Sequence, residues 1–346
     1  MPQGIACQRF LSGLCLSIFA ALFWCANSLH GVTSETKEDI LQDPQFKRGF
    51  AVRAAMVPPE GKASDPLYFE SAGAILPYGA KDKPVWRLAQ WYSHYNLLNA
   101  TPERLQSGST RFFDGAKSVT FGESGTSEAD LTLALNGRTE WNDVAPSTNS
   151  AWPHLIANQA LQSSSLSEMK ALPFHISYRL LRSDAHRGAG WDERRHTAQF
   201  ILFLTVRNCN ETSSGFGDYL WFGVPMYDAR FSVPKEFQAR DKGNAKKVGT
   251  NKFIFIPNGE KFSTVPAITG DWITVDHDLL PLILKAVESA WSEGFLLDSR
   301  DIKDYRLGCI TINWEVTGPV DVAMQLRDLR IAQVRSSELS HRDIAR

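Results

Sequence analysis

Residues 196–230 are the most clearly patterned part of the chain, because a period of two sorts their side chains into an apolar face and a mixed face. The segments TAQFILFLTVR and YLWFGVPMYD both have a period of two, which is typical of β-strands. The short connection CNETSSGFG between them is rich in turn-forming residues. We therefore predict a β-hairpin or two neighbouring strands here, and the rest of the fold is organised around them.

The same alternation sorts the side chains of the two strands into opposite faces. The predicted core face consists of Ala198, Phe200, Leu202, Leu204, Val206, Leu220, Phe222, Val224 and Met226. The other face of the second strand carries Tyr219, Trp221, Gly223 and Tyr227. Aromatic rings beside Gln199 and Arg207 suit a sugar, which has apolar C–H faces and a rim of hydroxyls, so this face is a candidate glycan-binding surface. Burial of the same rings under a second layer is the competing interpretation.

Similar patterns predict further strands along the chain. They lie in GFAVRAAMV, LYFESAGAIL, RFFDGAKSVTFG, ADLTLALNG, LPFHISYRLLRSD, NKFIFIP, DYRLGCITINWEV and GPVDVAMQLRDLRI. We expect the last two to close the domain as a hairpin with Asn313 and Glu315 facing outward. One segment, DHDLLPLILKAVESAWSEG, has helical spacing instead, with Asp276 or Asp278 as N-cap and Gly294 as stop.

About ten strands, one helix and no regular alternation of strands with helices predict an all-β protein. The expected architecture is a two-sheet antiparallel β-sandwich of jelly-roll type with one α-helix in the C-terminal half. We place this β-sandwich domain at 46–335. A flexible N-terminal segment at 29–45 precedes it, and a polar tail at 336–346 follows.

The first 28 residues have the three zones of a secretory signal peptide. Arg9 precedes the apolar run FLSGLCLSIFAALFWCA, and a small-residue site ends at Ser28. The alternative is a retained membrane anchor, although the apolar run is at the short end for a bilayer span. Cleavage would leave only Cys209 and Cys309, which could form one disulfide or remain unpaired and buried. The localisation we expect is secreted or periplasmic, with no membrane partner after cleavage.

Charge and motifs exclude several classes of function. The formal net charge is -1, and the sequence has no long basic block, which argues against nucleic acid as a partner. It contains no GxSxG elbow, Walker loop, GxGxxG fingerprint or HExxH helix, and no His/Cys cluster at metal-ligand spacing. We therefore expect no metal and no cofactor.

Polar residues on the predicted strand faces are the candidates for chemistry. Glycoside hydrolysis needs two carboxyl groups across the scissile bond, and Glu315 is the best candidate for one of them. Possible partners are Asp218, Asp228 and Asp321. A lyase acting on uronate polymers would need a neutralising Arg or Gln and a Tyr or His base. Those roles fit Arg179, Gln199, His175 and Tyr227.

These considerations define two sets of residues. The candidate catalytic residues are Glu315, His175 and Arg179. The candidate ligand-binding residues are Tyr219, Trp221, Tyr227, Gln199, Arg207 and Asn313. For Asp228 and Arg230 in PMYDAR, we favour a local ion pair that shapes the loop.

The blocks WITVDHDLLPLILKA and NWEVTGPVDVAMQLRDLRI, together with the aromatic strands and the signal peptide, resemble secreted jelly-roll proteins of bacterial polysaccharide metabolism. That group includes carbohydrate-binding modules and lectin-like sandwich enzymes. The resemblance is one of architecture, and it implies a β-sandwich and a glycan or polysaccharide partner. It transfers no catalytic motif. Glycan binding, processing by a hydrolase or lyase, and a non-catalytic structural or interaction role in the cell envelope all remain open.

We predict that the mature protein begins near Leu29, because the signal's small-residue site ends at Ser28. Intact-mass measurement on protein recovered from its native host tests this. Retention of Met1 or of other residues before Ala26 would contradict it.

Overall fold

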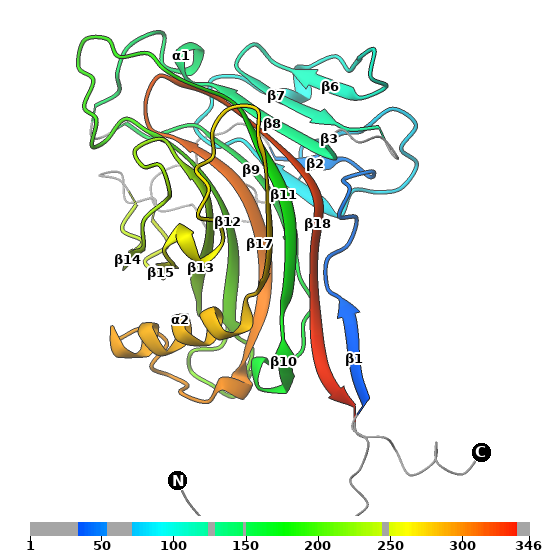
Figure 1. Ribbon diagram of the computed structural model, residues 1–346, viewed down its shortest axis with the longest axis vertical. Helices are drawn as coiled ribbons and strands as arrows, with labels where there is room; N and C mark the ends of the chain where they lie inside the picture. Colours follow the sequence, from blue (N-terminus) through cyan, green and yellow to red (C-terminus); the bar gives the residue numbers. More distant parts are fainter. Residues whose placement is uncertain (1–33, 54–70, 124–128, 148–149, 244–248, 338–346) are drawn as a thin grey trace, which may run out of the picture. The chain divides into compact units, whose positions relative to one another are not determined.

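The computed structural model describes residues 34–53, 71–123, 129–147, 150–243 and 249–337. Ser34–Ser337 form one compact unit. The described residues contain eighteen strands in two sheets of nine, and one helix longer than a single turn, α2 (Leu280–Ser292) (Figure 1). This confirms the predicted all-β sandwich of jelly-roll type with one helix. The predicted signal peptide lies outside the described residues.

Sheet A consists of β16 (Trp272–Asp278), β11 (Pro173–Ala185), β18 (Val320–Ser337), β8 (Leu131–Asn136), β7 (Lys117–Phe121), β6 (Thr110–Phe113) and β5 (Glu103–Arg104), in this order. Two more strands, β1 (Ser34–Asp39) and β10 (Met169–Ala171), pair with β18. All pairings in this sheet are antiparallel.

Sheet B consists of β14 (Phe237–Arg240), β15 (Phe253–Ile256), β13 (Tyr219–Asp228), β12 (Ala198–Asn208), β17 (Tyr305–Val316), β9 (His154–Ala160), β4 (Trp86–Ala89), β2 (Phe50–Val52) and β3 (Gly73–Ile75). The pairs β13–β15 and β2–β4 are parallel, so sheet B is mixed. Short helical turns are α1 (Gly137–Glu140), η2 (Leu97–Asn99), η3 (Leu166–Glu168), η4 (Gly259–Lys261) and η5 (Ile302–Asp304).

The core lies between the two sheets and contains the side chains that the alternation placed there. All the apolar residues assigned to the core face of the central hairpin are buried. Trp314 of β17 is fully buried, and its indole Nε1 donates to the carbonyl oxygen of Leu133 on β8 at 3.0 Å. This hydrogen bond satisfies a buried donor and ties sheet B to sheet A.

The predicted closing hairpin of the last two strands is wrong. β17 pairs with β12 and β9 in sheet B, whereas β18 pairs with β8 and β11 in sheet A. The chain crosses from one sheet to the other between Val316 and Val320, as it does between β8 and β9 and between β11 and β12. A strand with one buried face has the same pattern in either sheet, so alternation could not distinguish the two arrangements.

The predicted flexible segment at 29–45 is also wrong from Ser34 onward. β1 pairs along the end of β18, and Ile40 and Leu41 after it are buried. The predicted tail at 336–346 also begins too early, because β18 extends to Ser337. The estimate of about ten strands was low because many strands have only two to four residues.

Helix α2 confirms the predicted helix, although it starts at Leu280. Its N-cap is Leu279, which makes no side-chain cap hydrogen bond, so the predicted N-caps Asp276 and Asp278 are wrong. Asp278 precedes the N-cap, and its Oδ1 accepts the Leu280 N–H at 3.1 Å. Gly294 adopts a positive φ of 83°, which ends the helix as predicted. The helix lies across one end of the sandwich (Figure 1) and buries Ile283 and Val287 in the core.

A fully buried ammonium group, that of Lys117 at the start of β7, holds together segments distant in sequence. Its Nζ lies 2.8 Å from Asp114 and 3.5 Å from Glu140. It also donates to the carbonyl oxygen of Tyr95 at 3.0 Å and to the Ser93 hydroxyl. The cluster thus joins the turn between β6 and β7, helix α1 and the loop that follows β4.

That loop, residues 90–97, is closed by its own side chains. The buried Gln90 accepts the Leu97 N–H at 3.0 Å and donates to Asn96 at 2.6 Å. Tyr92 has a positive φ of 61°, which is costly for an aromatic residue. The loop therefore has a fixed conformation, which positions the side chains described below.

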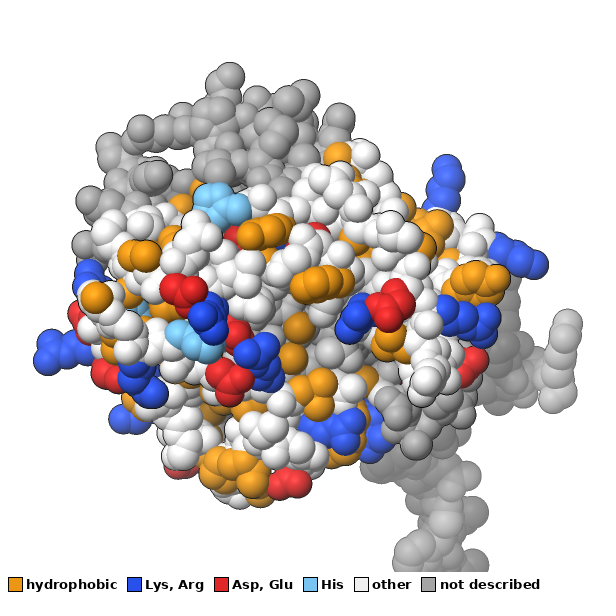
Figure 2. Space-filling model, turned by 90° about the horizontal axis from the view of Figure 1, so that it is seen from above, with side chains coloured by type: hydrophobic (Ala, Val, Ile, Leu, Met, Phe, Trp, Pro, Cys, Tyr) orange, Lys and Arg blue, Asp and Glu red, His pale blue; other side chains and the backbone are white. Residues whose placement is uncertain are grey.

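Charged side chains of both signs lie among one another on the end of the molecule shown in Figure 2. No helix in the described part of the chain is long and apolar enough to cross a bilayer.

We predict that Lys117→Met lowers the free energy of unfolding by about 3 to 5 kcal/mol, because it leaves Asp114 and Glu140 buried without their cation. Urea unfolding measures the change. The matched control is Arg187→Gln, which breaks the exposed pair Arg187–Glu193 and should cost less than about 1 kcal/mol. Equal effects of the two variants would refute the anchoring role of Lys117.

Candidate functional site

The face of sheet B that points away from sheet A, called the outer face here, gathers most of the predicted ligand-binding residues. Strand register aligns Gln199 with Glu315 and Ile201 with Asn313 across β12 and β17. It also aligns Thr205 with Trp221 and Arg207 with Tyr219 across β12 and β13. The structure therefore brings together on one surface Gln199, Arg207, Tyr219, Trp221, Asn313 and Glu315.

Glu315 lies in a transverse row of polar side chains on this face. Its cross-strand neighbours are His154 on β9 and Gln199 on β12, and Asp228 on β13 lies beyond Gln199. Neighbouring strands are about 4.8 Å apart, so one sugar unit spans one or two members of the row. Glu315, His154 and Gln199 are each partly exposed.

The carboxyl group of Glu315 has a raised pKa. Burial raises its pKa to about 7, and the negative charge of Asp241 adds to the increase. Asn313 donates from Nδ2 to Oε1 of Glu315 at 3.2 Å and so fixes the carboxyl group. A carboxyl that keeps its proton near neutral pH can act as a general acid.

His154 was not singled out by the sequence, yet it lies beside Glu315. Its ring is surrounded by those of Trp91, Tyr92 and Trp152, with centroids 6.4, 5.9 and 6.1 Å away. Burial lowers the pKa of His154 to about 4, so the imidazole is neutral at pH 7. Within the described residues, its Nδ1 has no hydrogen-bond partner. A neutral imidazole among rings suits hydrogen bonding to a sugar hydroxyl.

Asp228 is held in place and is a poor catalytic partner for Glu315. Arg230 binds it through Nε at 2.9 Å and Nη2 at 2.6 Å, which confirms the predicted local ion pair. Gln199 also donates to its Oδ2 at 2.8 Å. Asp228 thereby orients Gln199 in the row.

The other two predicted partners lie elsewhere. Asp218 pairs with Lys252 at 2.5 Å, at the opposite end of β13 from Asp228. Asp321 is on β18 of sheet A, where Arg182 and His186 contact it. Neither aspartate faces Glu315.

Asp241, which the sequence did not indicate, is the carboxylate whose charge acts on Glu315. It follows β14 and accepts hydrogen bonds from the Thr250 N–H at 2.8 Å and the Thr250 hydroxyl at 2.7 Å. Thr250 Oγ1 in turn accepts from the indole of Trp221 at 3.2 Å. Asp241 is thus linked to the aromatic part of the same face.

The rings on this face form an edge-to-face cluster. Tyr219 and Trp221 have centroids 5.3 Å apart and an interplanar angle of 88°, and Phe203 meets Trp221 at 67°. Trp221 is partly exposed. There is no free space above Gly223, because a Cβ there would lie 2.8 Å from Ile256 and 2.9 Å from Phe203. Any ligand therefore contacts ring edges and the exposed part of Trp221.

Tyr227 does not belong to this face, contrary to the prediction. A β-bulge leaves Met226 without a partner on β12, so that Pro225 pairs with Ile201 and Tyr227 with Phe200. The Tyr227 hydroxyl donates to Ser183 on β11 at 2.7 Å, between the sheets. Proline in a strand interior is a signal for such a bulge.

His175 and Arg179 are wrong as partners of Glu315, because they lie on β11 of sheet A. His175 contacts Asp276 at 3.3 Å, and Arg179 donates to Gln325 and stacks on Trp272. Their side chains alternate with the core residues of β11 and so face away from sheet B. The lyase constellation of Arg179, His175, Gln199 and Tyr227 does not assemble.

Of the two alternatives left open for Cys209 and Cys309, the disulfide does not form. Cys209 and Cys309 are both free thiols. The Cys209 N–H donates to the carbonyl oxygen of Asp304, the residue just before β17. Cys309 lies five residues farther on, within the extended strand β17. That offset corresponds to about 16 Å, far beyond the reach of a disulfide.

Comparisons with protein-family models and with curated proteins found no match. Among solved structures, the chain is similar to a loop-swap mutant of Xyn11A from Necallimastix patriciarum (TM-score 0.34, 6% identity, 68% of this chain and 95% of that one). It is also similar to endoglucanase cel12A from Rhodothermus marinus (TM-score 0.32, 8% identity, 69% of this chain and 97% of that one). A metagenome-derived glycoside hydrolase family 12 endoglucanase matches with a TM-score of 0.35 and 9% identity, over 74% of this chain and 100% of that one. At TM-scores this low, the matches assign neither a family nor a function.

We predict that Glu315→Gln raises the free energy of unfolding above pH 7 by up to about 3 kcal/mol relative to the parent. The native carboxyl keeps its proton to about pH 7, whereas the unfolded one ionises near its usual 4.5. The parent therefore loses stability as pH rises between these values, and glutamine does not titrate. Urea unfolding at pH 4.5 and pH 8 measures the difference.

The control for this prediction is Glu288→Gln on the exposed side of α2, which should follow the parent at both pH values. The raised pKa of Glu315 would be refuted if Glu315→Gln also followed the parent.

Proposed function

We propose that the protein is an exported polysaccharide-processing enzyme that binds a glycan on the outer face of sheet B and uses Glu315 as its proton donor. The observation that carries this proposal is the setting of Glu315. Its pKa is raised to about 7 on a face that also holds amides, a neutral imidazole and partly exposed rings.

The proposed reaction is hydrolysis of a glycosidic bond, which needs one protonated and one ionised carboxyl group. Glu315 gives its proton to the bridging oxygen as the bond from that oxygen to the anomeric carbon breaks. Asp241 accepts a proton from the water that attacks the anomeric carbon. Asp241 then releases its proton to solvent and Glu315 takes one up from solvent, so the cycle needs no cofactor.

The other residues of the face bind and orient the glycan in this proposal. Gln199, held by Asp228, and His154 flank Glu315 and offer hydrogen bonds to ring hydroxyls. Trp221 and the rings near His154 offer apolar contact to C–H faces. These roles require a carbohydrate partner, and they require no nucleic acid.

A binding protein without catalysis is the second candidate. It is favoured by the hydrogen bonds that already engage Asp241, since Thr250 uses its Oδ2 and Gly243 its Oδ1. Export through the predicted signal peptide suits both candidates, because polysaccharides lie outside the cytoplasm.

We predict that Glu315→Gln lowers the cleavage rate by about 10²- to 10⁴-fold, the usual contribution of a general acid, while glycan binding persists. Trp221→Ala should weaken binding about fivefold through loss of about 1 kcal/mol of ring contact, with the fold retained. A polysaccharide array, followed by analysis of reducing-end products, measures binding and cleavage on the same panel.

Glu288→Gln, remote on α2, is the control and should match the parent in both measurements. Binding without products in the parent would support the second candidate. The proposed function would be overturned if the parent neither bound nor cleaved any polysaccharide of the panel, or if Glu315→Gln cleaved at the parental rate.

A further inference from the structure

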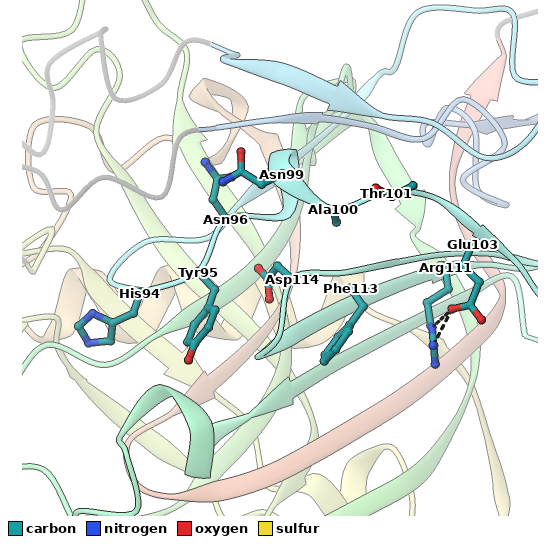
Figure 3. A pocket seen from close by; sticks show the side chains of 10 residues that line it. All are labelled: His94, Tyr95, Asn96, Asn99, Ala100, Thr101, Glu103, Arg111, Phe113 and Asp114. Atoms are coloured by element: carbon teal, nitrogen blue, oxygen red, sulfur yellow. Dashed lines mark hydrogen bonds and ion pairs between the residues drawn. The ribbon is translucent and has the colours of Figure 1, made fainter.

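A pocket of about 600 Å³ lies beside the turn of the β6–β7 hairpin, which belongs to sheet A. Figure 3 shows the rings of Tyr95 and Phe113 on one side of it and the amides of Asn96 and Asn99 on the other, with Asp114 between them. Phe113 is 53% exposed, which is unusual for a phenylalanine without a partner. The pocket thus presents apolar ring surface opposite hydrogen-bonding groups.

The carboxylates that line the pocket already face cations. Glu103 accepts from Arg111 at 2.6 and 3.0 Å at one end of the pocket. Asp114 lies 2.8 Å from Lys117 behind the pocket wall. A ligand charge of either sign would have to compete with these pairs, so the pocket favours an uncharged ligand.

The walls of the pocket are pre-formed. Gly115 has a φ of 105°, and a Cβ on it would lie 3.2 Å from the ring of Tyr95, so this ring packs on bare backbone. Asn96 is fixed because its Oδ1 accepts from the Leu98 N–H at 3.0 Å and from Gln90. A rigid pocket loses little conformational entropy when a ligand enters.

We propose that this pocket is a second carbohydrate-binding site, which takes a neutral pyranose unit. A pyranose has an apolar C–H face for Phe113 and Tyr95 and hydroxyls for Asn96 and Asn99, and it carries no charge. The site shares no residue with the outer face of sheet B, and its assignment does not depend on the role of Glu315.

Calorimetric titration of the full-length protein tests the proposal, with neutral tetrasaccharides of glucose, mannose, galactose or xylose units as probes. At least one probe should bind the parent, and Phe113→Ala should weaken that binding event about tenfold. Phe113→Tyr keeps the ring and should retain the affinity. Trp221→Ala should leave this event unchanged, which separates it from binding on sheet B.

Phe216→Ala is the matched control, because Phe216 is 49% exposed but lies in the loop between β12 and β13. It should bind the probe as the parent does. The pocket assignment is overturned if no tetrasaccharide binds, or if Phe113→Ala binds with parental affinity. Failure of the proposed enzyme function has a different signature, namely no cleavage and no effect of Trp221→Ala on any polysaccharide.

Discussion

The buried ammonium group of Lys117 is the interaction on which both candidate sites depend. Removing a charge from water costs several kcal/mol unless it is paired and hydrogen-bonded, and here carboxylates, a hydroxyl and a carbonyl surround it. Two of these partners, Ser93 and Tyr95, belong to the loop after β4. The loop gives Trp91 and Tyr92 to the ring cluster around His154, and Tyr95 and Asn96 to the pocket. An irregular loop can position side chains this firmly only because a buried network fixes its backbone.

The electrostatics of the outer face follow from strand register. Glu315 and His154 are opposite each other, and burial disfavours the charged form of each, which raises one pKa and lowers the other. Between about pH 4 and pH 7, the pair therefore has a protonated carboxyl group beside a neutral imidazole. Such a surface can make hydrogen bonds with hydroxyls without binding counterions, which suits a polyhydroxylated ligand better than an ionic one.

The sequence predicted what depends on local alternation and missed what depends on pairing between strands. The core residues of β12 and β13, the face of Asn313 and Glu315, and helix α2 all follow from period and capping. Alternation cannot assign a strand to a sheet, so His175 and Arg179 were combined with residues of the other sheet. It also fails across a bulge, which turned Tyr227 inward. His154 was missed because only strand register aligns it with Glu315. Asp241 was missed because its electrostatic effect on Glu315 depends on how the chain folds.

Tyr92 shows why one short loop can serve two sheets. Its positive φ costs about 1 to 2 kcal/mol. Trp91 and Tyr92 contact His154 on β9, whereas the carbonyl oxygen of Tyr95 accepts from Lys117 at the start of β7. The hydrogen bond from the His154 N–H to the carbonyl oxygen of Trp91 secures the first half, and the Lys117 cluster secures the second. Because the strain is held between two fixed ends, the rings of the loop are positioned before any ligand arrives, and binding at either site need not order the loop.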